Sequence, residues 1–402
     1  MDTLTKPISA PRRRTTADTV YPILLLVSVT HLLNDMMQSV IPAVYPLLKA
    51  KFGFSFAQIG LITLVFQMTS SILQPFVGRY ADRHPRPYSL AAGMCFTLAG
   101  LFALALAPGF APILLAVALI GWGSSIFHPE SSRVAQLASG GRKGLAQSIF
   151  QVGGNAGSAF GPLLAALVVI PYGQTSIMWF APAALLAIGI LLRIGNWYKR
   201  QLTAATAAPV TATTAAAELP RRKIRRALLI LTVLVFSKYF YIACMTNYFT
   251  FFLMDKFAFS VQDAQYSLFA FLAASAAGTV IGGPLGDRIG RKYVIWGSIL
   301  GAAPFALMLS YAGSGGAVAL AILVGLIISS AFVVYATDLM PGRVVMIAGL
   351  FFGLMFGLGG LGSAFFGWLA DRTSIEFIFR VSALLPLMGI ITGFLPDVER
   401  KR

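Results

Sequence analysis

Three ionisable residues interrupt an otherwise apolar part of the sequence. His128, Glu130 and Arg133 lie in the segment FHPESSRVAQL, which follows the uncharged run APILLAVALIGWGSSI. Ionised side chains are costly inside a membrane and are usually kept there for a function. Glu130 and Arg133 are three positions apart, so a helix would place them on one face, where they can pair. The pattern predicts proton or ion chemistry, and the alternative is a buried pair that only fixes helix packing.

A second ionisable pair lies in the first apolar segment. His31 and Asp35 are four positions apart, and Gln38 follows almost one turn later, so one helix face carries all three. Burial favours the neutral form of a carboxyl group, whereas a nearby cation favours its charged form, so a balanced acid can gain or lose a proton. The candidates for proton coupling are Asp35, Glu130, His31 and His128. Among them we favour Glu130 as the main carrier, because Arg133 can be captured or released as it titrates.

Cations and tyrosines in apolar surroundings indicate what such a protein binds. Lys238 opens the stretch KYFYIACMTNYF, and Asp338 lies in a later apolar segment. Two fixed cations among aromatic walls suit a small organic anion, and a guanidinium suits a phosphonate. The tyrosines, including Tyr248, have a simpler alternative role in packing. The substrate-binding candidates are Arg133, Lys238, Tyr239, Tyr241, Asn247 and Gln38.

The composition is that of a helical membrane protein. Of the 402 residues, 57% are hydrophobic and only 11% are charged, and the mean hydropathy is +0.78. Apolar runs of roughly 20 residues recur, each long enough to cross about 30 Å of hydrocarbon. The sequence therefore predicts an all-α polytopic membrane protein with twelve transmembrane helices. These lie near residues 20–48, 56–78, 88–108, 111–138, 144–170, 174–196, 227–254, 261–285, 292–312, 316–340, 344–370 and 374–395.

The net charge of +17 has an uneven distribution along the chain. Lys and Arg concentrate in both terminal tails and in alternate loops, as positive-inside asymmetry requires. This pattern predicts a membrane protein with both termini in the cytoplasm. The positive charge then reports topology and contact with anionic lipid headgroups, and we expect no nucleic-acid partner.

The chain divides into two similar halves. KFGFSFAQ begins at Lys51 and KFAFSVQD at Lys256, and Asp82 and Asp287 share the same offset of 205 residues. An Ala/Thr-rich and then basic stretch lies between the halves and is typical of a flexible linker. The predicted units are a cytoplasmic tail (1–19), a six-helix bundle (20–197), a cytoplasmic linker (198–226), a second six-helix bundle (227–396) and a cytoplasmic tail (397–402).

This layout resembles the major facilitator superfamily, whose members join two six-helix repeats. GGPLGDRIGRK (282–292) is similar to a signature motif of that superfamily, and its first copy surrounds Asp82. The segments HLLNDMMQS and FSKYFYIACMTNYFTFFLM resemble a bacterial branch of fosmidomycin-resistance drug exporters. We expect the two motif copies to form a charge latch between the halves, the alternative being interfacial anchoring. The gating candidates are Gly78, Asp82, Arg83, Gly283, Asp287, Arg288 and Arg291.

A small-residue motif in the fifth predicted helix is similar to the antiporter motif of the superfamily. The stretch GGNAGSAFGP carries Gly153, Gly157, Gly161 and Pro162. Close helix packing through small residues explains the same pattern without any specific function. The motif alone therefore favours export over import only slightly.

Taken with the charges, the resemblance implies a proton-coupled exporter of small anionic antibiotics such as phosphonates, working by alternating access. A facilitator or proton symporter for an organic anion or sugar is the main alternative. An intramembrane enzyme is remote, because the three His and the two cysteines, Cys95 and Cys244, lie in separate segments. We expect no metal and no cofactor beyond the proton gradient, and a monomer with protons, a small molecule and the bilayer as its partners.

Overall fold

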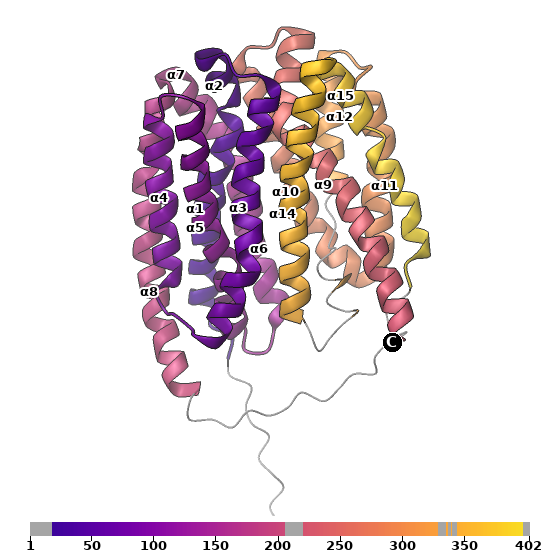
Figure 1. The fold of residues 1–402 in the computed structure, drawn as a ribbon. Helices are drawn as coiled ribbons and strands as arrows, with labels where there is room; N and C mark the ends of the chain where they lie inside the picture. The colour runs from indigo at the N-terminus through magenta and orange to yellow at the C-terminus, as the bar shows by residue number, and fades with distance from the viewer. Residues whose placement is uncertain (1–17, 206–219, 329–334, 337–338, 340–343, 397–402) are drawn as a thin grey trace, which may run out of the picture.

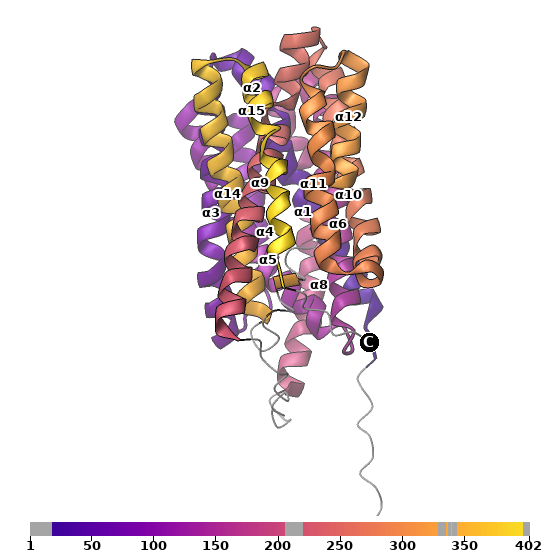
Figure 2. The ribbon, with the colours of Figure 1, turned by 90° about the vertical axis from the view of Figure 1, so that its right-hand side faces the viewer.

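The computed structural model describes residues 18–205, 220–328, 335–336, 339 and 344–396, and the described elements are all helices. The helices lie side by side along one common direction, as Figure 1 and Figure 2 show. Helix α1 (Tyr21–Ala43) begins and α8 (Ala181–Ala205) ends at one end of the bundle, which we call the terminal end. The opposite end, where α2 (Tyr45–Phe52) and α15 (Ile375–Ser382) lie, is called the distal end.

The N-terminal half contains the first six of the predicted membrane spans. Its helices are α1 (Tyr21–Ala43), α2, α3 (Phe56–Arg83), α4 (Ser89–Leu106), α5 (Phe110–Leu137), α6 (Lys143–Leu164), the π-helix η1 (Ala165–Val169), α7 (Ile170–Tyr172), the 3-10 helix η2 (Gln174–Phe180) and α8 (Ala181–Ala205). The first span is divided between α1 and α2 at Val44. Pro46 lies in the first turn of α2, where its missing N–H removes no helical hydrogen bond.

The C-terminal half contains the remaining predicted spans. Its helices are α9 (Arg221–Phe257), α10 (Val261–Ile289), α11 (Arg291–Leu309), α12 (Ser314–Ile327), α14 (Val344–Arg372), α15 and the 3-10 helix η4 (Leu385–Phe394). Among the described residues, eleven helical segments are long and apolar enough to cross a membrane. The shorter apolar helix α12 occupies the start of the tenth predicted span, part of whose remainder lies outside the described residues.

Contacts between the two halves run along two helix pairs. Helix α3 packs along α14, and α6 packs along α10. Within the N-terminal half, α1 packs against α6, and α5 packs against α3 and α4. This arrangement puts α1 and α5, which carry most of the ionisable candidates, in contact with each other.

Some sequence predictions fall outside the described part of the chain. The side chains of Asp82, Arg83 and Asp287 do so, and Gly78 and Gly283 are described only as positions within α3 and α10. Arg288 is exposed in the last turn of α10, and Arg291 begins α11. Asp338 and both predicted tails, apart from residues 18–19, also lie outside it. The gating motif therefore stays a prediction.

The predicted linker, residues 198–226, is partly helical. Helix α8 continues to Ala205, and α9 begins at Arg221, so both helices reach into that range. Residues 206–219 lie outside the described part of the chain. The domain boundaries stay predictions.

Candidate functional site

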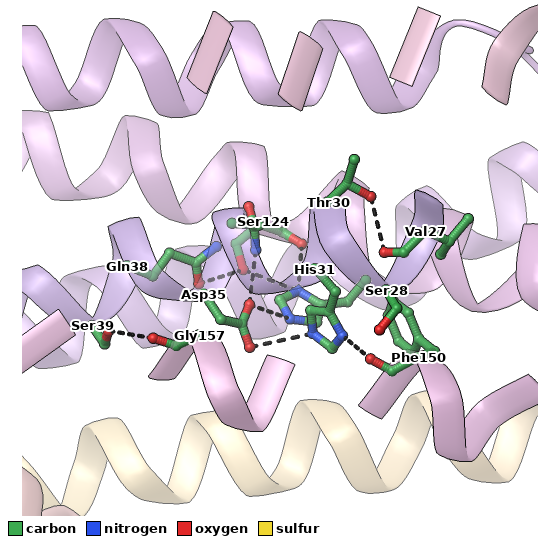
Figure 3. Close-up of polar contacts among 12 residues, drawn as sticks. Val27, Ser28, Thr30, His31, Asp35, Gln38, Ser39, Ser124, Phe150 and Gly157 are labelled. Carbon is green, nitrogen blue, oxygen red and sulfur yellow. Dashed lines mark hydrogen bonds and ion pairs between the residues drawn. The ribbon is translucent and has the colours of Figure 1, made fainter. Parts of the chain in front are cut away.

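Asp35 lies between two histidines from neighbouring helices. On α1, His31 Nε2 is 3.2 Å from Asp35 Oδ2, and on α5, His128 Nε2 is 3.5 Å from Asp35 Oδ1. Asn34 Nδ2 also donates a hydrogen bond of 2.9 Å to Asp35 Oδ1. Figure 3 shows the carboxylate facing both imidazole rings. We call these three residues the His–Asp–His group.

The second nitrogen of each ring fixes where one hydrogen must be. His31 Nδ1 is 2.8 Å from the carbonyl oxygen of Phe150, and His128 Nδ1 is 3.1 Å from that of Ser124. A carbonyl oxygen can only accept, so both Nδ1 atoms carry the hydrogen and donate it. Each Nε2 that faces Asp35 then holds either a lone pair or an additional proton.

This arrangement makes the group sensitive to its proton content. A lone pair on Nε2 would face a carboxylate oxygen and repel it, whereas a proton on either atom turns the contact into an attractive one. His31 is only 2% exposed, whereas Asp35 and His128 retain 17% and 13% exposure. Adding or removing a proton at this group would therefore change the contacts between α1 and α5.

The same side chains are the described group that could hold a metal ion, since their donor atoms all lie within 4.8 Å of one another. Each imidazole, however, contacts its own oxygen of the carboxylate directly. Shared protons account for these two contacts without any further partner. The role of the group in proton coupling stays a prediction.

Aromatic rings and one glycine hold His31 in place. Its ring stacks on Phe150 of α6, with centroids 3.9 Å apart and planes inclined by 15°. A Cβ atom at Gly154 would overlap the His31 ring, so only glycine leaves room for it there. The His128 ring lies 5.6 Å from that of Phe356 on α14. The group therefore also contacts the C-terminal half.

Gln38 adjoins the His–Asp–His group through Ser124. Ser124 Oγ donates to Gln38 Oε1 at 3.2 Å and accepts from Ser70 Oγ at 3.0 Å. The Oε1 atom of Gln38 therefore already accepts a hydrogen bond within the protein. Among the described residues, its Nε2 is buried and has no hydrogen-bond partner. Buried polar groups are usually paired, so this amide has N–H donors to offer to a bound molecule.

Glu130 and Arg133 form a separate pair on another side of α5. Their Oε1 and Nη1 atoms are 3.7 Å apart, and Glu130 is only 2% exposed. Ser89 of α4 donates to Glu130 Oε2 at 3.5 Å, and Arg133 Nη1 donates to the Tyr198 hydroxyl of α8 at 3.4 Å. The pairing expected from the spacing is present. On other helices, the described contacts of the Glu130–Arg133 pair are with α4 and α8, whereas His128 contacts α1.

The candidates on α9 have dissimilar surroundings. Lys238 is 6% exposed, and its Nζ lies 5.6 Å from the ring centroid of Tyr239. Tyr241 is buried in the main hydrophobic core, as the packing alternative predicts. Asn247 Oδ1 accepts a hydrogen bond of 2.6 Å from Thr63 of α3. Asn247 thus joins the two halves, and its binding role stays a prediction.

The small-residue motif on α6 is packed against α1. Cβ atoms at Gly153, Gly157 and Gly161 would overlap Ser28, Leu32 and Ser39, respectively. Close packing through small residues is thus present, whether or not the motif has a further role. Pro162 lies in the last turn of α6, just before η1.

Sequence reasoning missed several residues of the site. Asn34 and Gly154 are next to residues that it selected, but a neutral amide and a second glycine carry no strong signal. Ser124 and Phe150 contribute backbone carbonyl groups, which no sequence pattern reveals. The spacing of four between Ser124 and His128 was the one available hint, because it places the ring beside that carbonyl.

Comparisons with known proteins give the family. The family model of the Major Facilitator Superfamily matches residues 27–260 and 231–402. The fosmidomycin resistance protein of Escherichia coli (strain K12) is 56% identical over 400 residues, covering 98% of each chain. An uncharacterised MFS-type transporter of Bacillus subtilis (strain 168), YfnC, is 42% identical over 403 residues, again covering 98% of each chain.

Solved structures agree on the fold. A bacterial homologue of the human lysosomal transporter Spinster, in an inward-facing and occupied conformation, matches with a TM-score of 0.77 at 14% identity, covering 96% of this chain and 99% of that one. Its inward-facing and unoccupied structure matches with a TM-score of 0.70 at 16% identity, covering 94% and 96%. The all-α major facilitator fold predicted from the sequence is confirmed. The chain belongs to the major facilitator superfamily and is a multi-pass membrane transporter, not an enzyme.

Proposed function

We propose that this transporter is a proton-coupled exporter of small anionic antibiotics, such as fosmidomycin-like phosphonates. The 56% identity to a fosmidomycin resistance protein supports this class of substrate. Export of a drug against its gradient needs an energy source, and a proton moving inward through the same alternating-access cycle supplies it. The transporter then needs no cofactor.

The observation that carries the proposal is the His–Asp–His group. Its two Nε2 atoms lie 3.2 and 3.5 Å from separate oxygens of Asp35. Because both Nδ1 hydrogens are donated to carbonyl groups, protons entering the group have the Nε2–carboxylate contacts as their binding places. We therefore assign Asp35 as the main proton carrier, in place of Glu130, with His31 and His128 as its partners.

Substrate and proton would meet at Gln38. Its unpartnered Nε2 can donate hydrogen bonds to an anionic oxygen, and its Oε1 is held by Ser124, which also contacts His128. Antiport requires that proton and substrate bind in alternation. Protonation of the His–Asp–His group would change the contact between His128 and Ser124, and through Ser124 it would weaken the Gln38 site that the anion uses. Proton binding and substrate release are then coupled through Ser124.

Transport into proteoliposomes tests the proposal. The purified transporter is placed in proteoliposomes with an imposed proton gradient, and uptake of fosmidomycin, a second phosphonate, a neutral drug and a cationic drug is compared. We expect gradient-driven accumulation of the phosphonates, with each accumulated substrate dissipating the gradient. A preference for the neutral or cationic drug would exclude the anionic substrate class.

The same assay separates exporter from symporter. An antiporter accumulates substrate in vesicles that are acidic inside, because protons leave as substrate enters. A proton symporter for an organic anion or sugar accumulates substrate only with the opposite gradient. We further propose that the protein works as a monomer in the bacterial inner membrane with both termini in the cytoplasm, as its basic loops predict.

A further inference from the structure

A carboxylate of the C-terminal half holds the first turn of a helix in the N-terminal half. Asp371 lies in the last turn of α14 at the distal end. Its Oδ1 accepts a hydrogen bond of 2.8 Å from the backbone N–H of Phe56, and its Oδ2 accepts one of 2.8 Å from that of Ala57. A carboxylate that accepts backbone N–H groups at a helix N-terminus gains from the charge as well as from the hydrogen bonds.

The hydrogen bonds of the first turn of α3 can be fully accounted for. A helix leaves its first four N–H groups without internal partners. Two of them are satisfied by a capping box: Ser55 Oγ accepts from the Gln58 N–H, and Gln58 Oε1 accepts from the Ser55 N–H. Asp371 satisfies the two others. The start of α3 is therefore completed by a residue of the opposite half.

The second repeat lacks this carboxylate. Val261 begins α10 at the position that corresponds to Phe56, and Ser260 caps α10 as Ser55 caps α3. Across that interface, Gln262 Nε2 donates to the carbonyl oxygen of Ala166 at 3.3 Å. Among the described contacts, this interface therefore has a neutral amide that donates to a carbonyl oxygen, and no carboxylate accepts the backbone N–H groups of Val261 and Gln262. The difference points to a specific role for Asp371 rather than to general helix capping.

Water can replace the Asp371 contact when the halves separate. Asp371 is exposed, and a cavity of about 490 Å³ at this end is lined in part by Phe56, Ala370 and Thr373. Further along α3, the buried Thr63 hydroxyl donates to Asn247 Oδ1 of α9 in the other half at 2.6 Å. The distal contact is therefore the solvent-accessible edge of a larger closed interface.

We propose that Asp371 is a gating residue of the transport cycle. Its carboxylate stabilises the state that is closed at the distal end, and it releases Phe56 and Ala57 each time that end opens. The inference rests on alternating access by the two halves. It does not depend on which substrate or ion is transported. The gating role can therefore fail while the proposed function holds, and the proposed function can fail while the gating role holds.

Distances between spin labels across the distal end test this role. Tyr172 and Ser314 are exposed residues of opposite halves at that end, and labels at these positions require a background of Cys95→Ser and Cys244→Ala. We expect Asp371→Ala to raise the ratio of open to closed distal ends about fivefold, as expected for the loss of hydrogen bonds to an exposed charge. Asp371→Asn should raise it less, because its one oxygen can still accept one N–H.

Asp263→Asn is the matched control. Asp263 is an exposed acid in the first turn of α10, and its carboxylate accepts from Ser260 within its own half. This variant should leave the distance distribution unchanged. If Asp371 had only a structural role, Asp371→Ala and Asp371→Asn would lower the melting temperature, but their folded fractions would keep the spin-label distance distribution of the parent. That result would overturn the proposal. Asp371→Asn carries the test if the alanine variant does not fold.

Discussion

The backbone of Gly154 lies directly against the imidazole ring of His31. A Cβ atom added to Gly154 would overlap the ring atoms Cε1 and Nε2. Nε2 is the atom that faces Asp35 at 3.2 Å. A glycine of α6 thus limits where the ring atom that faces Asp35 can lie, and Phe150 of the same helix stacks on that ring.

Gly154→Ala should therefore impair coupling more than folding. The methyl group must displace the ring, and overpacking of this kind costs about 1–3 kcal/mol. Because about 1.4 kcal/mol changes an equilibrium tenfold, we expect gradient-driven transport to fall by about tenfold or more. Substrate exchange without a gradient should fall less. Proteoliposome transport in both modes gives the comparison.

Gly144→Ala is the control on the same helix. A Cβ atom at Gly144 meets no other atom within 4 Å, so this variant should transport at the parent rate. Equal losses in gradient-driven transport and in exchange for Gly154→Ala would show that the glycine serves packing alone.

The fold was accessible from the sequence because a bilayer permits few alternatives. Every backbone polar group must be satisfied within a spanning helix, so apolar runs of roughly 20 residues report helices directly. The copied segments at Lys51 and Lys256 then gave the two repeats. Kinks such as the break at Val44 and the π-helix after Pro162 depend on local packing, and the apolar pattern did not reveal them.

The site was only partly accessible. Spacing within one helix correctly placed His31 beside Asp35 and Glu130 beside Arg133. It could not decide which of these pairs His128 joins, because that depends on how α5 is rotated against α1. The contacts of Asp371 with the start of α3 join residues more than 300 positions apart, and no local pattern carries such information.

Arg133→Ala should destabilise the protein. The substitution removes the described ion-pair partner of Glu130, a carboxylate that is only 2% exposed. Breaking a buried pair is costly because the other charge loses compensation, and the 24% exposure of Arg133 reduces the expected loss to about 2 kcal/mol. Thermal unfolding in detergent measures it, with Arg133→Lys expected to recover part of the loss.

The double variant Glu130→Gln with Arg133→Ala provides the control. Removing the buried charge together with its partner should restore much of the melting temperature. If instead the single and double variants are as stable as the parent but bind phosphonates weakly, the role of Arg133 is to bind the substrate and not to compensate the charge of Glu130.

Asn247 and Thr63 should behave as one unit. Their hydrogen bond of 2.6 Å links α9 to α3, and Thr63 also accepts from the Tyr45 hydroxyl at 2.6 Å. We expect Thr63→Val and Asn247→Ala each to destabilise the state that is closed at the distal end by about 1–3 kcal/mol, as for buried polar groups that lose a partner. The double variant should cost little more than either one. Additive losses, or a rise in KM confined to Asn247→Ala, would instead assign Asn247 to substrate binding.

Asp35→Asn tests the coupling mechanism itself. The amide resembles a permanently neutral acid, and its nitrogen can face only one of the two imidazole Nε2 atoms as a donor. Substrate binding should survive, since Gln38, Arg133 and Lys238 are unchanged. Exchange of substrate for substrate should also survive, because that cycle moves no net proton. Export driven by a proton gradient should be lost.

Glu130→Gln is the informative comparison for Asp35→Asn. The Glu130 carboxylate is paired with Arg133, and the described contacts of this pair lie toward α4 and α8. The Glu130→Gln variant should therefore retain more gradient-driven export than Asp35→Asn does. Both variants are compared in proteoliposomes, with and without an imposed gradient, and with exchange as the measure of folded and active protein. If Asp35→Asn exported at the parent level while Glu130→Gln did not, the proton carrier would be Glu130, and the His–Asp–His group would be a structural link between α1 and α5.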